Sequence, residues 1–153
     1  MAEARLAIRL EPEVFEPLQA LALWHEQLWA ALGREPAAES LFIGRVRPTN
    51  SSGEPLKALE LEHYPGMTER QLERLAAASS ARHGVMAVLV HHRVGLVLPG
   101  EAIVLVAVAA DRRGPAQRCG GELLEALKHE APFWKREWRG DGRGHWLDGN
   151  TPL

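Results

Sequence analysis

The stretch VMAVLVHHRVGLVLPGEAIVLVAVAA, residues 85–110, decides the fold class of this chain of 153 residues. It holds two long runs rich in apolar and β-branched residues, at 85–92 and 102–110, and a shorter run at 94–98. Such runs are typical of buried strands. Pro99-Gly100 marks the turn before the last run. Neighbouring strands with links this short favour antiparallel pairing.

Working outward, the segments on both sides of this stretch contain helix signals. Apolar residues recur every three or four positions between residues 18 and 32, which is helical spacing. Thr68 with Gln71 forms a capping-box signature for a second helix, and Gly84 suits the position just after that helix. The sequence predicts three helices, at residues 16–32, 69–82 and 115–130.

The remaining segments complete the expected order of elements. Three further strands are predicted, at residues 5–9, 40–47 and 57–64. The order β-α-β-β-α-β-β-β-α, with mainly antiparallel strands, predicts an α+β fold in a single domain over residues 1–153. The glycine-rich end, 138–153, is expected to be a flexible or partner-contacting tail with Trp146 as its anchor.

Composition excludes several classes of protein. Hydrophobic residues make up 46% of the chain and the formal net charge is -2. A balanced charge gives no reason to expect nucleic acid as a partner. The sequence lacks both the ~18-residue apolar run of a membrane span and the apolar segment of a signal peptide. The single cysteine, Cys119, cannot form an internal disulfide, so we expect a reducing, cytoplasmic location.

Positive charge gathers at the ends of three predicted elements. Arginine and lysine side chains from such ends can converge into an anion pocket, because guanidinium forks suit phosphate geometry. The alternative is that they are ordinary solvated surface charges. The residues are Arg45 and Arg47, Arg112 and Arg113, and Lys128, Lys135 and Arg136.

The segment APFWKRE, residues 131–137, places aromatic rings beside a lysine. Aromatic neighbours can desolvate an ammonium group and lower its pKa, as acid/base chemistry by a lysine requires. The alternative is an aromatic anchor that pins the chain to the core after a helix.

Two other features receive structural interpretations. Cys119 could carry sulfur, but a small buried helix residue is the interpretation that we favour. His91 and His92 are adjacent in a predicted strand and point to opposite faces, so they cannot readily bind one metal ion. No metal site and no cofactor are expected.

Four segments resemble one known family in their order and roughly in their spacing. Together they cover about residues 40–138, whereas the first forty residues match poorly. The chain is similar to the large, catalytic subunits of molybdopterin synthase. The segments are LEHYPGMTE at 61–69, HRVG at 92–95 continuing to LPGE at 98–101, Leu127-Lys128 followed by APFWKRE, and the strand with Phe42, Gly44, Val46 and Arg47.

The resemblance implies a sulfurtransferase of molybdenum cofactor biosynthesis. In that family a ubiquitin-like small subunit carries a C-terminal Gly-Gly thiocarboxylate, and its tail inserts into a pocket of the large subunit. The sulfur passes to cyclic pyranopterin monophosphate, and two transfers form the dithiolene of molybdopterin. The resemblance also implies an α/β-hammerhead type of α+β fold, and a homodimer of large subunits within a heterotetramer.

The resemblance further implies roles for individual residues. Lys128 matches the family's catalytic lysine and is expected to transfer a proton or position the reacting groups. Lys135 matches a second lysine that binds the substrate and the incoming thiocarboxylate. Arg47 and Arg113 match basic residues expected to hold phosphate, and Arg112 stands beside them. Phe42 and residues 132–134 are expected to shape the pocket or the channel for the tail.

The sequence departs from the family at two places. Arg112 stands where the family has a histidine, which removes a group able to act as acid or base near neutral pH. This motivates an alternative: a non-catalytic homologue that only binds a ubiquitin-like partner. A family arginine in the C-terminal tail matches a place near Asn150.

Overall fold

The structure is a computed structural model that describes residues 3–147, so the expected tail contacts near Asn150 lie outside the described residues. All three predicted helices and all six predicted strands are present. In chain order the elements are β1 (Arg5–Glu11), α1 (Pro17–Leu32), β2 (Ala38–Arg45), β3 (Leu56–His63), α2 (Met67–His83), β4 (Ala87–Arg93), β5 (Gly95–Val97), β6 (Ala102–Ala110), α3 (Arg113–Glu130), β7 (Phe133–Arg139) and β8 (Gly144–Trp146).

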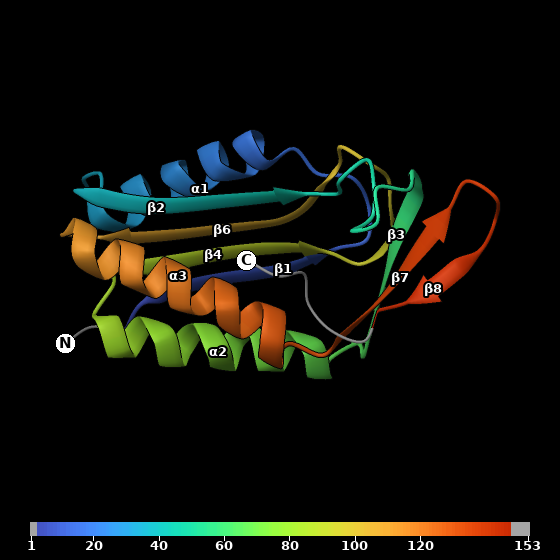
Figure 1. Cartoon of the computed structure of the whole chain (residues 1–153). Coiled ribbons are helices and arrows are strands. Elements are labelled where there is room, and N and C mark those ends of the chain that lie inside the picture. The colour runs from blue at the N-terminus through green and yellow to red at the C-terminus, as the bar shows by residue number, and fades with distance from the viewer. Residues whose placement is uncertain (1–2, 148–153) are drawn as a thin grey trace.

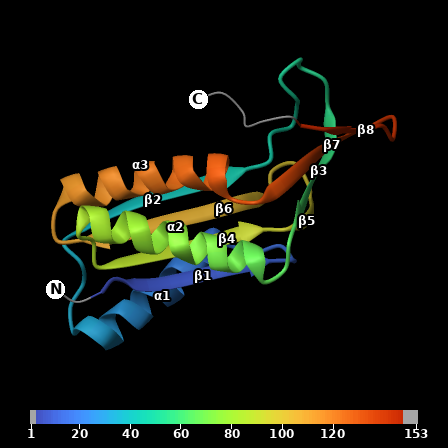
Figure 2. The same cartoon turned by 90° about the horizontal axis from the view of Figure 1, so that it is seen from below.

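The first sheet has the strand order β1-β4-β6-β2. Its two central strands are the apolar runs that decided the fold class, and they pair antiparallel with each other. β2 also pairs antiparallel with β6, whereas β1 pairs parallel with β4. Helix α1 covers one face, and α2 and α3 lie side by side over the other (Figures 1 and 2). The predicted α+β class is confirmed.

Both faces of the first sheet are buried because its central strands are apolar at nearly every position. Leu21, Trp24 and Leu28 of α1 pack on one face. Leu72 of α2 and Leu123 of α3 pack on the other face and are fully buried. Each such side chain contributes roughly 1.5–3 kcal/mol of burial free energy. This core holds the last turn of α3 in a fixed position against the sheet.

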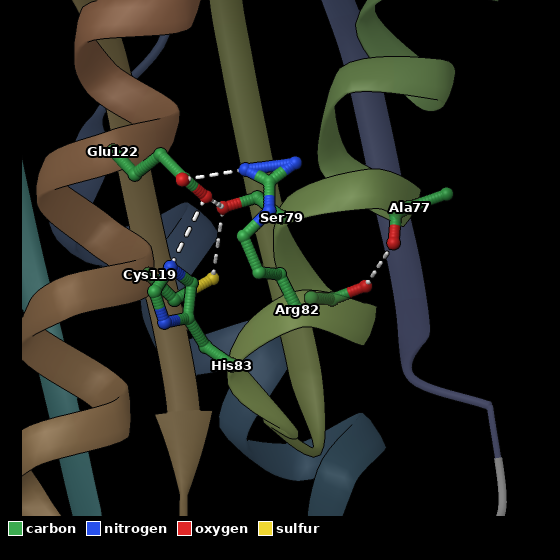
Figure 3. A network of polar contacts seen from close by, with 7 residues as sticks. Ala77, Ser79, Arg82, His83, Cys119 and Glu122 are labelled. Carbon is green, nitrogen blue, oxygen red and sulfur yellow. Dashed lines mark hydrogen bonds and ion pairs between the residues drawn. The ribbon is translucent and has the colours of Figure 1, made fainter.

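A polar network joins α2 to α3 at the edge of this core (Figure 3). Ser79 Oγ donates to Glu122 Oε2 at 2.7 Å, and Arg82 and His83 bind the same carboxylate. The Ser79 bond lowers the pKa of Glu122, with Arg82 as the next cause. Cys119 is fully buried beside Ser79, and burial raises the pKa of its thiol. The interpretation of Cys119 as a small core residue is confirmed.

The second sheet has the order β5-β3-β7-β8, with all its pairs antiparallel. It projects beyond the ends of α2 and α3 (Figures 1 and 2). Its inner face carries Leu59, Leu61 and Val97, which pack with Val46 and with the partly buried Phe133. The second sheet is therefore joined to the first through a shared apolar boundary.

Two quoted motifs have structural explanations. Gly66 has a φ of +83°, which glycine adopts without strain, and its N–H donates to the Glu69 carboxylate at 3.1 Å. Arg93 is buried, donates to Leu96 O at 2.9 Å and pairs with Glu101 at 3.5 Å. These contacts start α2 and hold the 94–101 turn.

Three expectations about these elements are wrong. The second helix begins at Met67 after Gly66, so the predicted capping box of Thr68 and Gln71 does not form. The Thr68 hydroxyl instead accepts from Tyr64 N–H at 3.0 Å. β4 and β5 follow each other in the chain but lie in different sheets. Within 138–147, the expectation of a flexible tail is wrong because these residues form the end of β7, a turn and β8, whereas the alternative of a partner-contacting tail stays a prediction.

Candidate functional site

A cavity of about 720 Å³ lies where the last turn of α3 meets the ends of β2 and β6 and the inner face of β7. Four of its lining side chains are cations, whereas Glu137 is the one acid among the lining residues of the described chain. The surrounding wall is largely apolar. An anion with both polar and flat apolar parts suits such a cavity. The cations are Arg45, Arg47, Lys128 and Lys135.

Lys128 and Lys135 enter the cavity from two different elements. The chain has three lysines, and the third, Lys57, is exposed on β3. Lys128 lies in the last turn of α3, and Lys135 lies on β7 opposite Leu61. Burial lowers the pKa of Lys135, and the charge of Lys128 lowers it further. This burial agrees with the interpretation of the APFWKRE segment as one that desolvates an ammonium group.

Arg45 and Arg47 flank a residue whose backbone is held on both sides. Val46 N–H donates to Glu101 O at 3.0 Å, and Val46 O accepts from Gly100 N–H at 2.9 Å. A register shift between Gly44 and Arg45 ends the regular pairing of β2 with β6. Both arginine side chains are exposed and line the cavity.

His92 is a cavity residue that the sequence did not identify. Its Nδ1–H donates to Arg93 O at 2.8 Å, and its ring stacks on Phe133 with centroids 4.0 Å apart. Burial lowers the pKa of His92 to about 4, so the ring is neutral near neutral pH. With its hydrogen on Nδ1, the neutral ring keeps Nε2 as a hydrogen-bond acceptor. In the sequence His92 stands beside His91 in an apolar strand, and this pattern did not indicate that His92 lines a cavity.

The apolar wall contains two residues expected to shape the pocket. Phe42 on β2 lines the cavity and is 39% exposed, and Trp134 on β7 lines it and is 46% exposed. Both keep an apolar surface open to solvent at the cavity. Phe133 also lines it, whereas Pro132 is absent from the lining. The aromatic segment therefore both anchors the chain and forms part of the cavity.

Three predicted basic residues lie elsewhere. Arg112 and Arg113 are exposed at the beginning of α3, and Arg113 precedes Lys128 by 15 residues, about 22 Å of helix rise. They do not line this chain's cavity. Arg136 binds Glu60 at 2.9 Å. Of the three basic segments, those at 45–47 and 128–136 contribute to one cavity of the described chain, whereas the segment at 112–113 does not.

Two absences concern the described part of the chain. Residues 3–147 contain no group of three or more His, Cys, Asp or Glu side chains able to hold a metal ion. In the same residues, no helix is long and apolar enough to cross a membrane.

Comparison with known proteins finds relatives that cover most of the chain. The family described as MoaE protein matches residues 16–130. The chain is 42% identical over 123 residues to the molybdopterin synthase catalytic subunit of Salmonella typhimurium, covering 80% of this chain and 81% of that one. It is 36% identical over 148 residues to the molybdopterin synthase catalytic subunit of Escherichia coli, and the match covers 97% of this chain and 92% of that one.

A solved structure gives the same result for the fold. The molybdopterin biosynthesis MoaE protein from Burkholderia ambifaria superimposes with a TM-score of 0.75 at 37% identity. The match covers 98% of this chain and 92% of that one.

Proposed function

The chain belongs to the MoaE protein family of molybdopterin synthase catalytic subunits, and on this premise we propose what its cavity does. It accepts the thiocarboxylate tail of a ubiquitin-like small subunit and cyclic pyranopterin monophosphate together. Sulfur passes from the tail to the pterin, and two such transfers form the dithiolene. A solved structural neighbour is a complex of subunits 1 and 2 of a molybdopterin-converting factor, which agrees with a two-subunit assembly.

The observation that carries this proposal is the meeting of Lys128 and Lys135 in one cavity beside Arg47. The thiocarboxylate and the cyclic phosphate are both anions, so a site for both must supply positive charge at two places. No cysteine of this chain is required, because the sulfur arrives on the partner. The buried, unreactive position of Cys119 supports this view.

The environment of the two lysines supports different roles. Lys135 has a lowered pKa, so it gives up a proton at lower pH than an exposed lysine. In our proposal its ammonium binds both anions. Lys128 transfers a proton or positions the groups at the reacting carbon. Arg47, which is exposed two residues beyond the end of β2, holds the phosphate.

Arg112 and Arg113 support the proposal only if a second copy of the chain contributes them. β2 is an edge strand of the first sheet and exposes Leu41 and Phe42, so its free edge can pair with another strand. If two β2 strands pair antiparallel about a twofold axis, the start of one strand lies beside the end of the other.

This pairing would complete the cavity with basic residues from the other protomer. Ala38 at the start of β2 pairs with Ala110, and the chain continues from there to Arg112 and Arg113. The same pairing would carry these arginines toward Arg45 and Arg47 of the other copy. We therefore propose that the homodimer is the catalytic unit. We also place the protein in the cytoplasm, where the free thiol of Cys119 stays reduced.

A single-turnover assay tests the proposed function. The protein is mixed with a thiocarboxylated small subunit and cyclic pyranopterin monophosphate, and the dithiolene product is measured. Product formation by the wild type, at one pterin per two thiocarboxylates, is the expected result. Complex formation without product would favour the binding-only alternative that Arg112 motivates, and Arg112→His would then be the variant to compare.

A further inference from the structure

The outer face of the second sheet carries a set of side chains of which only Trp134 also lines the cavity. Residues two apart on a strand share a face, so Trp134, Arg136 and Trp138 of β7 lie on the same side. Glu62 pairs with Trp134, and Trp146 pairs with Arg136. Within the described residues no helix covers this side of the sheet, which stands apart from the three helices (Figure 2).

Part of this face is held rigid by internal contacts. The guanidinium of Arg136 lies over two indole rings, 4.6 Å from the Trp138 centroid and 4.3 Å from the Trp146 centroid. The same arginine binds Glu60 at 2.9 Å, and Trp138 Nε1–H donates to that carboxylate at 3.0 Å. These contacts neutralise Glu60 and fix the orientation of both tryptophans before anything binds.

Beside this cluster lies a second hollow of about 360 Å³, lined by Glu62, His63, Tyr64, Trp134 and Trp146. The three aromatic residues are between 41% and 56% exposed. Tyr64 meets Trp134 edge to face, with centroids 5.2 Å apart. The Glu62 carboxylate is 56% exposed, and its nearest cation, Arg136, is 3.9 Å away and already bound to Glu60.

We propose that this hollow holds a lysine or arginine side chain from the body of the small subunit. Aromatic rings attract cations through the negative potential of their faces, and an adjacent carboxylate adds a direct charge interaction. Exposed Trp and Tyr residues fixed by their neighbours are also the residue types that dominate the binding energy of interfaces. The combination favours a basic side chain over an acidic or purely apolar one.

The position of Trp134 identifies the partner. Trp134 lines both the 720 Å³ cavity and the aromatic hollow, so the two share one wall. A small subunit whose tail enters the cavity must place the surface at the base of that tail over this wall. The inference therefore rests on the proposed function, and it adds a docking contact that the sulfur chemistry does not require.

The test measures binding of a ubiquitin-like small subunit in its carboxylate form by calorimetry, with no pterin present. Glu62→Lys should raise the Kd at least about tenfold, and Glu62→Gln by a smaller factor. Tyr64→Leu should weaken binding severalfold, whereas Tyr64→Phe, which keeps the ring, should not. At a saturating concentration of small subunit, the single-turnover rate of each variant should stay within about twofold of wild type, since neither residue lines the catalytic cavity.

Glu26→Lys is the matched control, because Glu26 is an exposed acid on α1, which covers the opposite face of the first sheet from α3. An unchanged Kd for the small subunit in Glu62→Lys would overturn the proposal. An equal rise of the Kd in Glu26→Lys would do so too. So would dissociation of the homodimer by Glu62→Lys in sedimentation without a change in small-subunit affinity. Failure of the wild type to form product would instead count against the proposed function, because the binding measurement contains no pterin.

Discussion

Burial, and then the ammonium charge of Lys128, lowers the pKa of Lys135, and both side chains line one cavity. Two like charges in a partly desolvated space repel each other until an anion enters between them. The arrangement is therefore unfavourable in the empty protein and favourable with substrate bound. This relationship links the fold to the reaction, because α3 supplies one lysine and β7 supplies the other.

Lys128→Ala should reduce product formation at least about 100-fold, the loss typical for removal of a proton-transfer or charge-stabilising group. Single-turnover product analysis measures it, and calorimetry should show unchanged binding of the small subunit. Lys57→Ala is the matched control, since Lys57 is the chain's exposed lysine outside the cavity. Near-normal turnover in Lys128→Ala would refute the role given to this residue.

Mixing two inactive variants should restore activity if Arg113 acts across the homodimer. In a dimer of Lys128→Ala with Arg113→Ala, one of the two cavities has both residues intact. Random exchange of subunits should therefore recover about a quarter of wild-type product formation. If Arg113 served its own chain's cavity, every cavity in the mixture would lack one residue and no activity would return.

His92 should make the protein less stable as the pH falls below neutral. Its pKa is about 4 in the folded protein and 6.5 as the reference value, so the unfolded chain binds more protons between these values. The stabilisation is fully present above pH 6.5 and is lost progressively toward pH 4, by about 3 kcal/mol at most. Denaturant unfolding between pH 4 and 7.5 measures this slope.

His92→Gln should flatten that slope without removing it, because burial also lowers the pKa of His91. Phe133→Leu provides the control. It removes the stacked ring but keeps the imidazole, so overall stability should fall while a pH-dependent slope persists. An identical slope in wild type and His92→Gln would contradict the assignment.

Glu122→Ala should lower the free energy of unfolding by about 1–2 kcal/mol, because Ser79 is buried and would lose its acceptor. Chemical denaturation at pH 7 measures the loss. Glu125→Ala, on the same helix, removes only an exposed pair with His129 and should cost under about 0.5 kcal/mol. Equal effects of the two substitutions would show that the α2–α3 network contributes nothing specific.

The elements that the sequence predicted well are those with a strong periodic signal. The run 102–110 is apolar at nearly every position and became β6 with the expected bounds. β7 was missed because its mixture of charged and aromatic residues contains no apolar run, although Trp134, Arg136 and Trp138 stand at every second position of the strand. The pairing of the strands was harder to predict than their positions, because long-range packing decides which of the two sheets contains β5.

Some residues of the candidate site could also be identified from the sequence, whereas others could not be placed. Residue type and resemblance identified Lys128, Lys135, Arg47 and Phe42, all of which line the cavity. Lys135 and Arg136 point to opposite faces of β7, so only Lys135 enters the cavity. The sequence analysis grouped the two residues because it did not predict this strand. It could not place Arg112 and Arg113 either, because distance along α3 becomes visible only after folding.

Gly120 gives α3 an unusual contact with the sheet. A Cβ at this position would stand 2.7 Å from Ser40 Oγ, so here the helix lies almost directly on β2. Leu124 and Lys128 follow Gly120 at intervals of four on the same helical face, as Phe42 and Gly44 follow Ser40 on the strand. Helix and strand thus form a wedge that is closed at Gly120 and open at the lysine. A side chain at position 120 would push α3 away from β2 two turns before Lys128, so in the proposed complex it would alter the space open to the pterin without touching a reacting atom.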